Sequence, residues 1–406
     1  MQFGNYFRKT SFRKVIDEMK INKKSIFVAI CAIFMIRPYY VQLSESINLI
    51  WALITLFMAS LCFIKIFKYR NTKRDKFFFA FICVYLMATL LNCRECILSA
   101  ISNCAQITLA YCLGRLYERD AYKRKIAKCM PTVISIYVYI DFITIILGFS
   151  EKVWGIESTI SFLGYDNYAA FYIVPMIGIK FSLDYVRRKK LNLEDLIFYS
   201  CSLMGKILTG SYTAAIAIAL FPIFAYIFLN IKYVRRWLNV KSFAVAIVLL
   251  FVGIYFFNIQ NVLSHLLSSM GKGITLNSRT VIWRVVLQGI FKVPIYGLGN
   301  FTEEYFMDFF GFPYGYNVTH SHFLFLDLVI QTGIIGLIAF LGMLFSIRFK
   351  NSYFKDFSLI YAYTSLLSYL ILCMFDSYPF LSMPYFVIGY IASLCWNTPS
   401  RKSGNT

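Results

Sequence analysis

Two of the three histidines in the chain, His320 and His322, lie where a long polar stretch gives way to an apolar segment. An unperturbed imidazole has a pKa of about 6.5, so His320 could accept a proton from a hydroxyl group near neutral pH. A histidine at a helix end could equally lie at an interface without a catalytic task. Asp327 follows on the same face of a predicted helix, two turns deeper. Because a carboxylate inside a membrane is costly, Asp327 should either orient His320 through an intermediate group or pair with a cation from another helix.

Two arginines, Arg279 and Arg284, precede these histidines in the same polar stretch. Asn277 or Ser278 can cap a helix that starts at Arg279 and ends near Lys292, with one polar stripe and an apolar flank. Such a helix should lie along a membrane surface or on top of a helix bundle. Its first turn favours anions, and a guanidinium there matches phosphate oxygens with two parallel hydrogen bonds. Either arginine could equally contact lipid headgroups.

The composition indicates the class of protein. Hydrophobic residues make up 59% of the chain and aromatic residues 19%, and the mean hydropathy is +0.63, which excludes a soluble domain. Apolar segments long enough to span a membrane recur along the sequence. We predict an all-α polytopic membrane protein with about 12 transmembrane helices and one long outer loop that contains a surface helix.

The net charge of +21 comes from 41 Lys and Arg against 20 Asp and Glu. These basic residues gather in alternate loops between the predicted helices, as the positive-inside rule describes, so the charge does not indicate nucleic-acid binding. Both termini are therefore predicted to be cytoplasmic. The predicted segments are a basic N-terminus (1–24), helices one to nine (25–257), the long extracytoplasmic loop (258–319), helices ten to twelve (320–396) and a cytoplasmic tail (397–406).

Two further features lie within or beside the predicted helices. Asp141 lies in the middle of the fifth helix, which we expect to begin at Pro131, and its simplest partner is one of the outer arginines. Cys93 and Cys96 could form a redox pair near an outer turn. We favour free thiols, because the other cysteines are scattered through apolar helices.

Several stretches between 164 and 336 together resemble the O-antigen ligase and polysaccharide polymerase family. They are Gly164-Tyr165-Asp166-Asn167-Tyr168-Ala169-Ala170, Thr209-Gly210-Ser211, Asn277-Ser278-Arg279 with Trp283, Pro294-Ile295-Tyr296-Gly297-Leu298-Gly299, His320-Ser321-His322-Phe323-Leu324 and Gly333-Ile334-Ile335-Gly336. Each is weak alone, but their order along the chain is fairly specific.

The resemblance implies a membrane glycosyltransferase that takes glycan from a polyprenyl diphosphate. The proposed base of that family falls on His320, with Ser321 in place of the usual asparagine, and its diphosphate-binding arginine falls on Arg279. The family often has an arginine where Tyr212 stands here. A second diphosphate contact must then come from Lys206 or Arg284, or be absent. Further candidate substrate contacts are His322, Asn167, Tyr212 and Asp327.

These observations predict direct displacement at the anomeric carbon, with inversion. No Asp-x-Asp occurs in a predicted outer loop, so we expect arginine rather than metal to hold the diphosphate, and no cofactor. The expected location is the bacterial cytoplasmic membrane, with a sugar-hydroxyl acceptor and, as possible partners, a chain-length regulator and a flippase. The residues do not separate a polymerase of capsule or exopolysaccharide repeat units from a ligase. We favour the polymerase only because the Lys, Ile and Tyr content suggests an AT-rich bacterium. A lipid-linked glycan flippase or other transporter is the alternative from another class.

Overall fold

The computed structural model describes residues 22–68, 72–153, 156–231, 239–257, 279–312, 318–347 and 356–396. Within them the chain is an all-α polytopic membrane protein. Eight of the described helices are long and apolar enough to cross a membrane: α4 (Glu45–Phe67), α5 (Lys73–Asn92), α6 (Ile97–Leu116), α7 (Asp120–Ile146), α8 (Asp166–Arg188), α10 (Tyr212–Asn230), α12 (Val240–Phe257) and α16 (Leu324–Phe345).

Four shorter helices occupy the positions of the other predicted spans. They are α2 (Lys23–Met35), α9 (Leu193–Leu208), α17 (Phe357–Leu372) and α18 (Ser382–Trp396). Three predicted segments lie wholly or largely outside the described residues: the basic N-terminus, the start of the long loop (258–278) and the C-terminal tail (397–406).

Two predicted helix starts were wrong. The fifth helix begins at Asp120 and contains Pro131, since neighbouring helices and local adjustment let membrane helices tolerate a proline. The tenth begins at Leu324, because His322 has a positive φ of 59° that cannot continue a right-handed helix. His320 therefore lies in an ordered loop before the helix.

Short connections set the direction of the helices. Helix α3 (Tyr39–Gln42) joins α2 to α4, a 3₁₀ turn η1 (Arg94–Cys96) joins α5 to α6, and a tight turn joins α9 to α10. Between α7 and α8 lies an unexpected antiparallel sheet in the order β1 (Ser150–Val153), β2 (Ile156–Ser161) and β3 (Gly164–Tyr165), with Ser150 opposite Thr159 and Ile160 opposite Tyr165. All these connections lie at one end of the bundle, which we call the site end.

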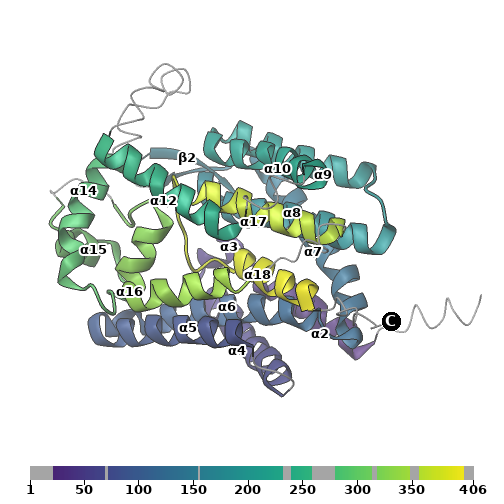
Figure 1. The fold of residues 1–406 in the computed structure, drawn as a ribbon, viewed down its shortest axis with the longest axis horizontal. Helices are drawn as coiled ribbons and strands as arrows, with labels where there is room; N and C mark the ends of the chain where they lie inside the picture. Colours follow the sequence, from purple (N-terminus) through teal and green to yellow (C-terminus); the bar gives the residue numbers. More distant parts are fainter. Residues whose placement is uncertain are drawn as a thin grey trace, which may run out of the picture.

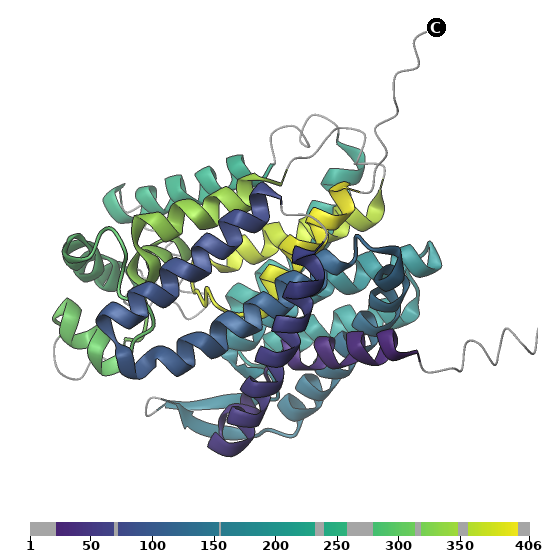
Figure 2. The same cartoon turned by 90° about the horizontal axis from the view of Figure 1, so that it is seen from below.

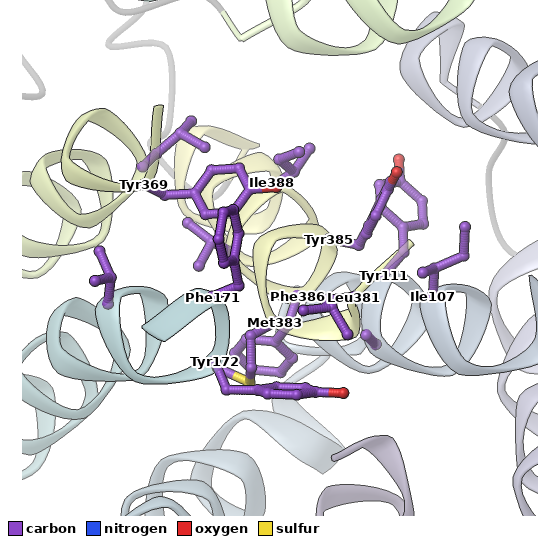
Figure 3. Packing of buried hydrophobic residues seen from close by; sticks show 14 of the residues in the cluster. Ile107, Tyr111, Phe171, Tyr172, Tyr369, Leu381, Met383, Tyr385, Phe386 and Ile388 are labelled. Atoms are coloured by element: carbon purple, nitrogen blue, oxygen red, sulfur yellow. The ribbon is translucent and has the colours of Figure 1, made fainter. Parts of the chain in front are cut away.

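Helix α18 runs through the middle of the bundle. Figure 3 shows side chains of α6, α8 and α17 meeting around it, among them Tyr111, Phe171 and Tyr369. Glycines bring the backbones of α6 and α18 together. A Cβ on Gly114 would lie 2.5 Å from the Phe386 carbonyl oxygen, and one on Gly389 would lie 2.4 Å from that of Tyr111. Small residues allow this approach between membrane helices.

Helices α14 (Arg279–Gly289) and α15 (Glu303–Phe310), with the 3₁₀ turn η3 (Ile290–Lys292), lie together at one end of the bundle, away from the last residues of α18 (Figures 1 and 2). The segment between η3 and α15 enters a break in α16. Gly333 interrupts that helix with φ 60° and ψ −171°. Leu298 and Gly299 donate their N–H groups to the carbonyl oxygens of Ile330 (2.6 Å) and Gln331 (2.9 Å), which satisfies backbone groups that the break exposes.

The two glycine-containing motifs around 294–299 and 333–336 are thus one structural unit. A Cβ on Gly333 would lie 2.0 Å from the Ile295 carbonyl oxygen, so only glycine allows the two segments to meet. This unit holds the first part of α16 against the segment that follows α14. It thereby also positions the loop that carries the histidines.

The Cys93 and Cys96 side chains form a disulfide, which corrects our preference for free thiols. The η1 turn folds back on itself and places the two Cα atoms 5.4 Å apart, within the usual range for a bridge. The positions of the other cysteines in apolar helices therefore do not predict whether two cysteines of the same turn form a disulfide.

Candidate active site

A carboxylate that the sequence analysis did not single out, Asp376, organises the site. It lies in the connection between α17 and α18 and is 4% exposed. Its Oδ1 atom accepts hydrogen bonds from His320 Nε2 at 2.8 Å and from His322 Nδ1 at 3.0 Å. Its Oδ2 atom accepts one from Asn167 Nδ2 at 3.1 Å. The Asp376 side chain of the α17–α18 connection is thus bonded by residues of two other segments, the loop before α16 and the first turn of α8.

The hydrogen bonds define the protons on the two imidazoles. Burial alone would raise the pKa of Asp376, but the hydrogen bonds from His320 and His322 outweigh it and hold the pKa well below the usual range. An ionised carboxylate can only accept, so both ring nitrogens that face it carry a proton. His320 Nδ1 is then free to accept, and the Thr319 hydroxyl donates to it at 2.7 Å.

The two histidines differ in basicity. Burial lowers the basicity of His320, but the hydrogen bond to Asp376 and its negative charge prevail, so its pKa is raised above 6.5. For His322, burial and the charge of the neighbouring His320 prevail and lower the pKa to about 4. The ring centroids are 4.0 Å apart. His320 is therefore the stronger base of the pair.

Asp327 supports the site through the backbone. Its Oδ1 atom accepts the Ser321 N–H at 2.6 Å, and its Oδ2 atom accepts the Ser377 hydroxyl. These two residues directly follow His320 and Asp376. Of the two roles left open for Asp327, orientation of His320 through an intermediate group fits these contacts.

Helix α14 packs onto the bundle through the face that carries Trp283. The Trp283 Nε1 atom donates to the Ser321 carbonyl oxygen at 2.8 Å, and the indole lies 4.8 Å from the Phe251 ring of α12. Arg279 lies one turn earlier on this face, partly buried, and interacts electrostatically with Asp376 and Tyr378. Burial lowers its pKa, but a guanidinium stays charged at any physiological pH. The structure therefore directs a cation toward the His–Asp cluster.

The other predicted substrate contacts divide into two groups. Asn167 joins the cluster and also accepts a hydrogen bond from the Ser211 hydroxyl. Arg284 is exposed on α14, and Tyr212 at the start of α10 is 43% exposed. In the described part of the chain, neither side chain forms a hydrogen bond with the His–Asp cluster.

Lys206 has a different partner from the one we expected. It is buried in α9, and its charge acts on Asp141 of α7. The Asp141 carboxylate also accepts the Leu163 N–H at 2.7 Å. The charge that acts on Asp141 thus comes from a lysine of α9, which packs directly against α7, rather than from an outer arginine.

Three other residues of the site were missed: Thr319, Ser377 and Tyr378. The signal that could have found Asp376, Ser377 and Tyr378 is the short polar turn between the last two apolar helices, whereas Thr319 directly precedes His320 in the sequence. An acidic residue in such a turn lies at the same end of the bundle as the histidines. A hydropathy profile, however, identifies this turn only as the boundary between two helices.

The ligand atoms of His320, His322 and Asp376 lie within 4.8 Å of one another, so this set could hold a metal ion. Both ring nitrogens concerned now donate protons to the carboxylate. A metal could bind these atoms only after both protons were lost, so the hydrogen-bonded and metal-bound arrangements exclude each other.

The fold and the site define a polytopic membrane protein with a buried His–Asp pair beside an arginine-bearing helix. Residues 197–341 match the family model described as O-antigen ligase, which confirms the family resemblance over this part of the chain. The match includes α14 and both histidines, whereas Asn167 and Asp376 lie outside it. It supports a membrane enzyme that transfers glycan from a lipid-linked donor to an acceptor. No curated protein matches the chain.

Proposed function

We propose that the protein is an inverting membrane glycosyltransferase that joins polyprenyl-diphosphate-linked oligosaccharide to a sugar hydroxyl. The observation that carries this proposal is the His320–Asp376 pair, 2.8 Å apart, beside Arg279 in a chain with an O-antigen ligase family match. A base and a phosphate-binding cation in one place are what direct displacement of a diphosphate requires.

In this mechanism Asp376 holds His320 with its proton on Nε2, which leaves the Nδ1 lone pair as the base. The acceptor hydroxyl replaces the Thr319 hydroxyl at Nδ1, or passes its proton through it. As the proton moves to Nδ1, the acceptor oxygen bonds to the anomeric carbon and the bond from that carbon to the diphosphate oxygen breaks. The leaving diphosphate takes the electron pair, and Arg279 stabilises its charge.

The distribution of charge supports an extracytoplasmic site. The opposite end of the bundle carries the basic ends of several helices, including Lys65, Lys73, Arg115 and Arg187. Cytoplasmic loops are enriched in such residues. The site end would then face away from the cytoplasmic supply of nucleotide sugars, which accounts for a lipid-linked donor. We therefore propose the cytoplasmic membrane of a bacterium as the location of the protein.

Transfer by purified protein from a defined polyprenyl diphosphate oligosaccharide tests the assignment of the base. We expect His320→Ala to reduce kcat by roughly 10²–10⁴-fold, the usual contribution of a general base. The matched variant is His322→Asn, because asparagine tolerates a positive φ, and it should retain kcat within about tenfold. Near-normal transfer by His320→Ala, or a larger loss in His322→Asn, would refute the assignment. Loss of transfer in EDTA that Mg²⁺ or Mn²⁺ restores would instead support the metal-bound arrangement.

A ligase is the second candidate, because the matching family model carries that description. Both reactions use the same donor and the same base, so products must decide. In a deletion strain, single repeat units left on their carrier or acceptor indicate a polymerase, and long chains left on the lipid carrier indicate a ligase. Reconstituted protein that moves lipid-linked glycan between leaflets without ever transferring it would refute both and support the transporter.

A further inference from the structure

A second polar cluster lies at the site end of the bundle, away from His320. Arg37 follows α2 and donates hydrogen bonds to Asn48 Oδ1 (3.5 Å), Ser102 Oγ (3.3 Å) and Asn103 Oδ1 (3.4 Å), on α4 and α6. All four side chains are partly buried. They therefore line a place that solvent or a ligand can still reach.

The charge of Arg37 is not neutralised within the described part of the chain. Its three hydrogen-bond acceptors are neutral, and its Nε atom is buried without a hydrogen-bond partner there. Other cations in the bundle have acids beside them, such as Arg115 with Asp75 at 3.2 Å and Lys180 with Asp184 at 2.7 Å. A partly buried guanidinium among neutral groups is costly unless an anion completes the site.

A row of aromatic rings connects this cluster to the active site. Beside Arg37, Tyr39 contacts Tyr165, with ring centroids 6.0 Å apart. Tyr165 and Tyr168 both contact Tyr378, through a 3.3 Å hydroxyl contact and a 5.0 Å ring contact respectively. The Tyr378 ring in turn lies 5.0 Å from His320.

These tyrosines suit a carbohydrate. They are all partly buried, so part of each tyrosine residue remains accessible. Tyrosine offers an apolar face against which the C–H groups of a sugar ring pack, and a hydroxyl that bonds sugar hydroxyls. The amide of Gln42 adds a donor, at 3.5 Å from the Tyr168 hydroxyl oxygen.

We propose that Arg37, with Asn48, Ser102 and Asn103, binds an acidic sugar unit of the acceptor glycan, and that the tyrosine row guides this glycan to His320. The acid would be a carboxylate or phosphate substituent, which the Arg37 guanidinium binds with charge-assisted hydrogen bonds. Because several rings separate Arg37 from His320, the acceptor is an oligosaccharide. This inference rests on the proposed glycan transfer but concerns binding, which needs no turnover.

The test measures binding to full-length protein in nanodiscs of zwitterionic lipid by microscale thermophoresis. The two probes are a hyaluronan tetrasaccharide, which carries glucuronate, and chitotetraose, which is neutral. We expect the acidic probe to bind about tenfold more tightly. Arg37→Gln should reduce the preference for the acidic probe to less than about threefold, and Arg37→Lys should keep part of that preference. The control is Arg94→Gln, at an exposed arginine of the same end of the bundle, which should leave the preference unchanged.

Three results would overturn the inference: equal binding of both probes, no binding of either, or a preference that persists in Arg37→Gln of normal melting temperature. Suppression of acidic-probe binding by phosphatidylglycerol in the nanodisc would also overturn it and assign the site to a lipid headgroup. The His320→Ala variant should keep the preference while it loses transfer, so failure of the catalytic proposal and failure of this one are distinguishable.

Discussion

Replacing Asp376 by asparagine removes the charge at the centre of the site and keeps its shape. The asparagine oxygen can accept from His320 and His322 as the carboxylate does. Its new NH₂ group would face the Asn167 amide, which can turn over so that its oxygen accepts instead, while the Ser211 hydroxyl remains bonded. We therefore expect Asp376→Asn to fold, with its effect confined to the chemistry.

The loss of charge should weaken His320 as a base. Asp376 provides both the hydrogen bond and the main attraction that raise the pKa of His320, whereas burial lowers it. Without the negative charge, burial prevails and lowers the pKa of His320, and the neutral amide oxygen holds the imidazole proton on Nε2 less strongly than the carboxylate did. We expect kcat to fall by roughly 10²–10⁴-fold, which corresponds to an increase of about 3–5 kcal/mol in the activation barrier.

The pH profile gives the sign of this effect. The neutral form of His320 is the base, so the wild-type rate should decline as the pH falls through a His320 pKa that lies above 6.5. In Asp376→Asn the same decline should move to lower pH, because the interaction that raised the pKa is gone.

The assay is transfer by purified protein between pH 5 and 9, as conditions chosen around the usual histidine pKa of about 6.5. The control is Asp308→Asn, which removes an exposed carboxylate of α15 and should leave both kcat and its pH dependence unchanged. An Asp376→Asn variant within about threefold of wild-type kcat, or with an unmoved acidic limb, would refute the pairing of Asp376 with the base.

Two further predictions use matched pairs of variants. Arg279→Lys should lower kcat by at least about tenfold, because lysine lacks the planar fork of the guanidinium. Arg284→Lys, at an exposed position, should resemble wild type. Equal effects of the two variants would contradict a diphosphate contact at Arg279. Gly333→Ala should lower the melting temperature more than Gly148→Ala, since both have positive φ but only the former places a Cβ 2.0 Å from Ile295 O. The excess should be about 1–3 kcal/mol, and equal thermal shifts in detergent would show that the break in α16 tolerates a side chain.

Much of the fold could be read from local patterns. Runs of apolar residues located the membrane helices, because a span of hydrocarbon demands a minimum length of helix whatever it packs against. Helix boundaries were less predictable. Pro131 looked like a start but lies within α7, and His320 looked like a helix residue but precedes α16. A proline inside a membrane helix and a positive φ at His322 are both features that hydropathy does not reveal.

The pairing of polar groups could not be predicted in the same way. Lys206 acts on Asp141 because α9 packs on α7, and the Cys93–Cys96 bridge forms because η1 folds back on itself. These are relations between side chains in space, and one sequence without its packing leaves several partners equally plausible.

By itself, the sequence determined that this chain is a multi-helix membrane protein, and it directed attention to His320 and Arg279, because residue type and hydropathy are local properties. The tertiary structure decided which acid lies beside that histidine. Asp376 is separated from His320 by the whole length of α16 and α17, and only the antiparallel return of these two helices places its carboxylate 2.8 Å from the imidazole. Proton transfer depends on that distance, so the chemistry of the site is a property of helix packing.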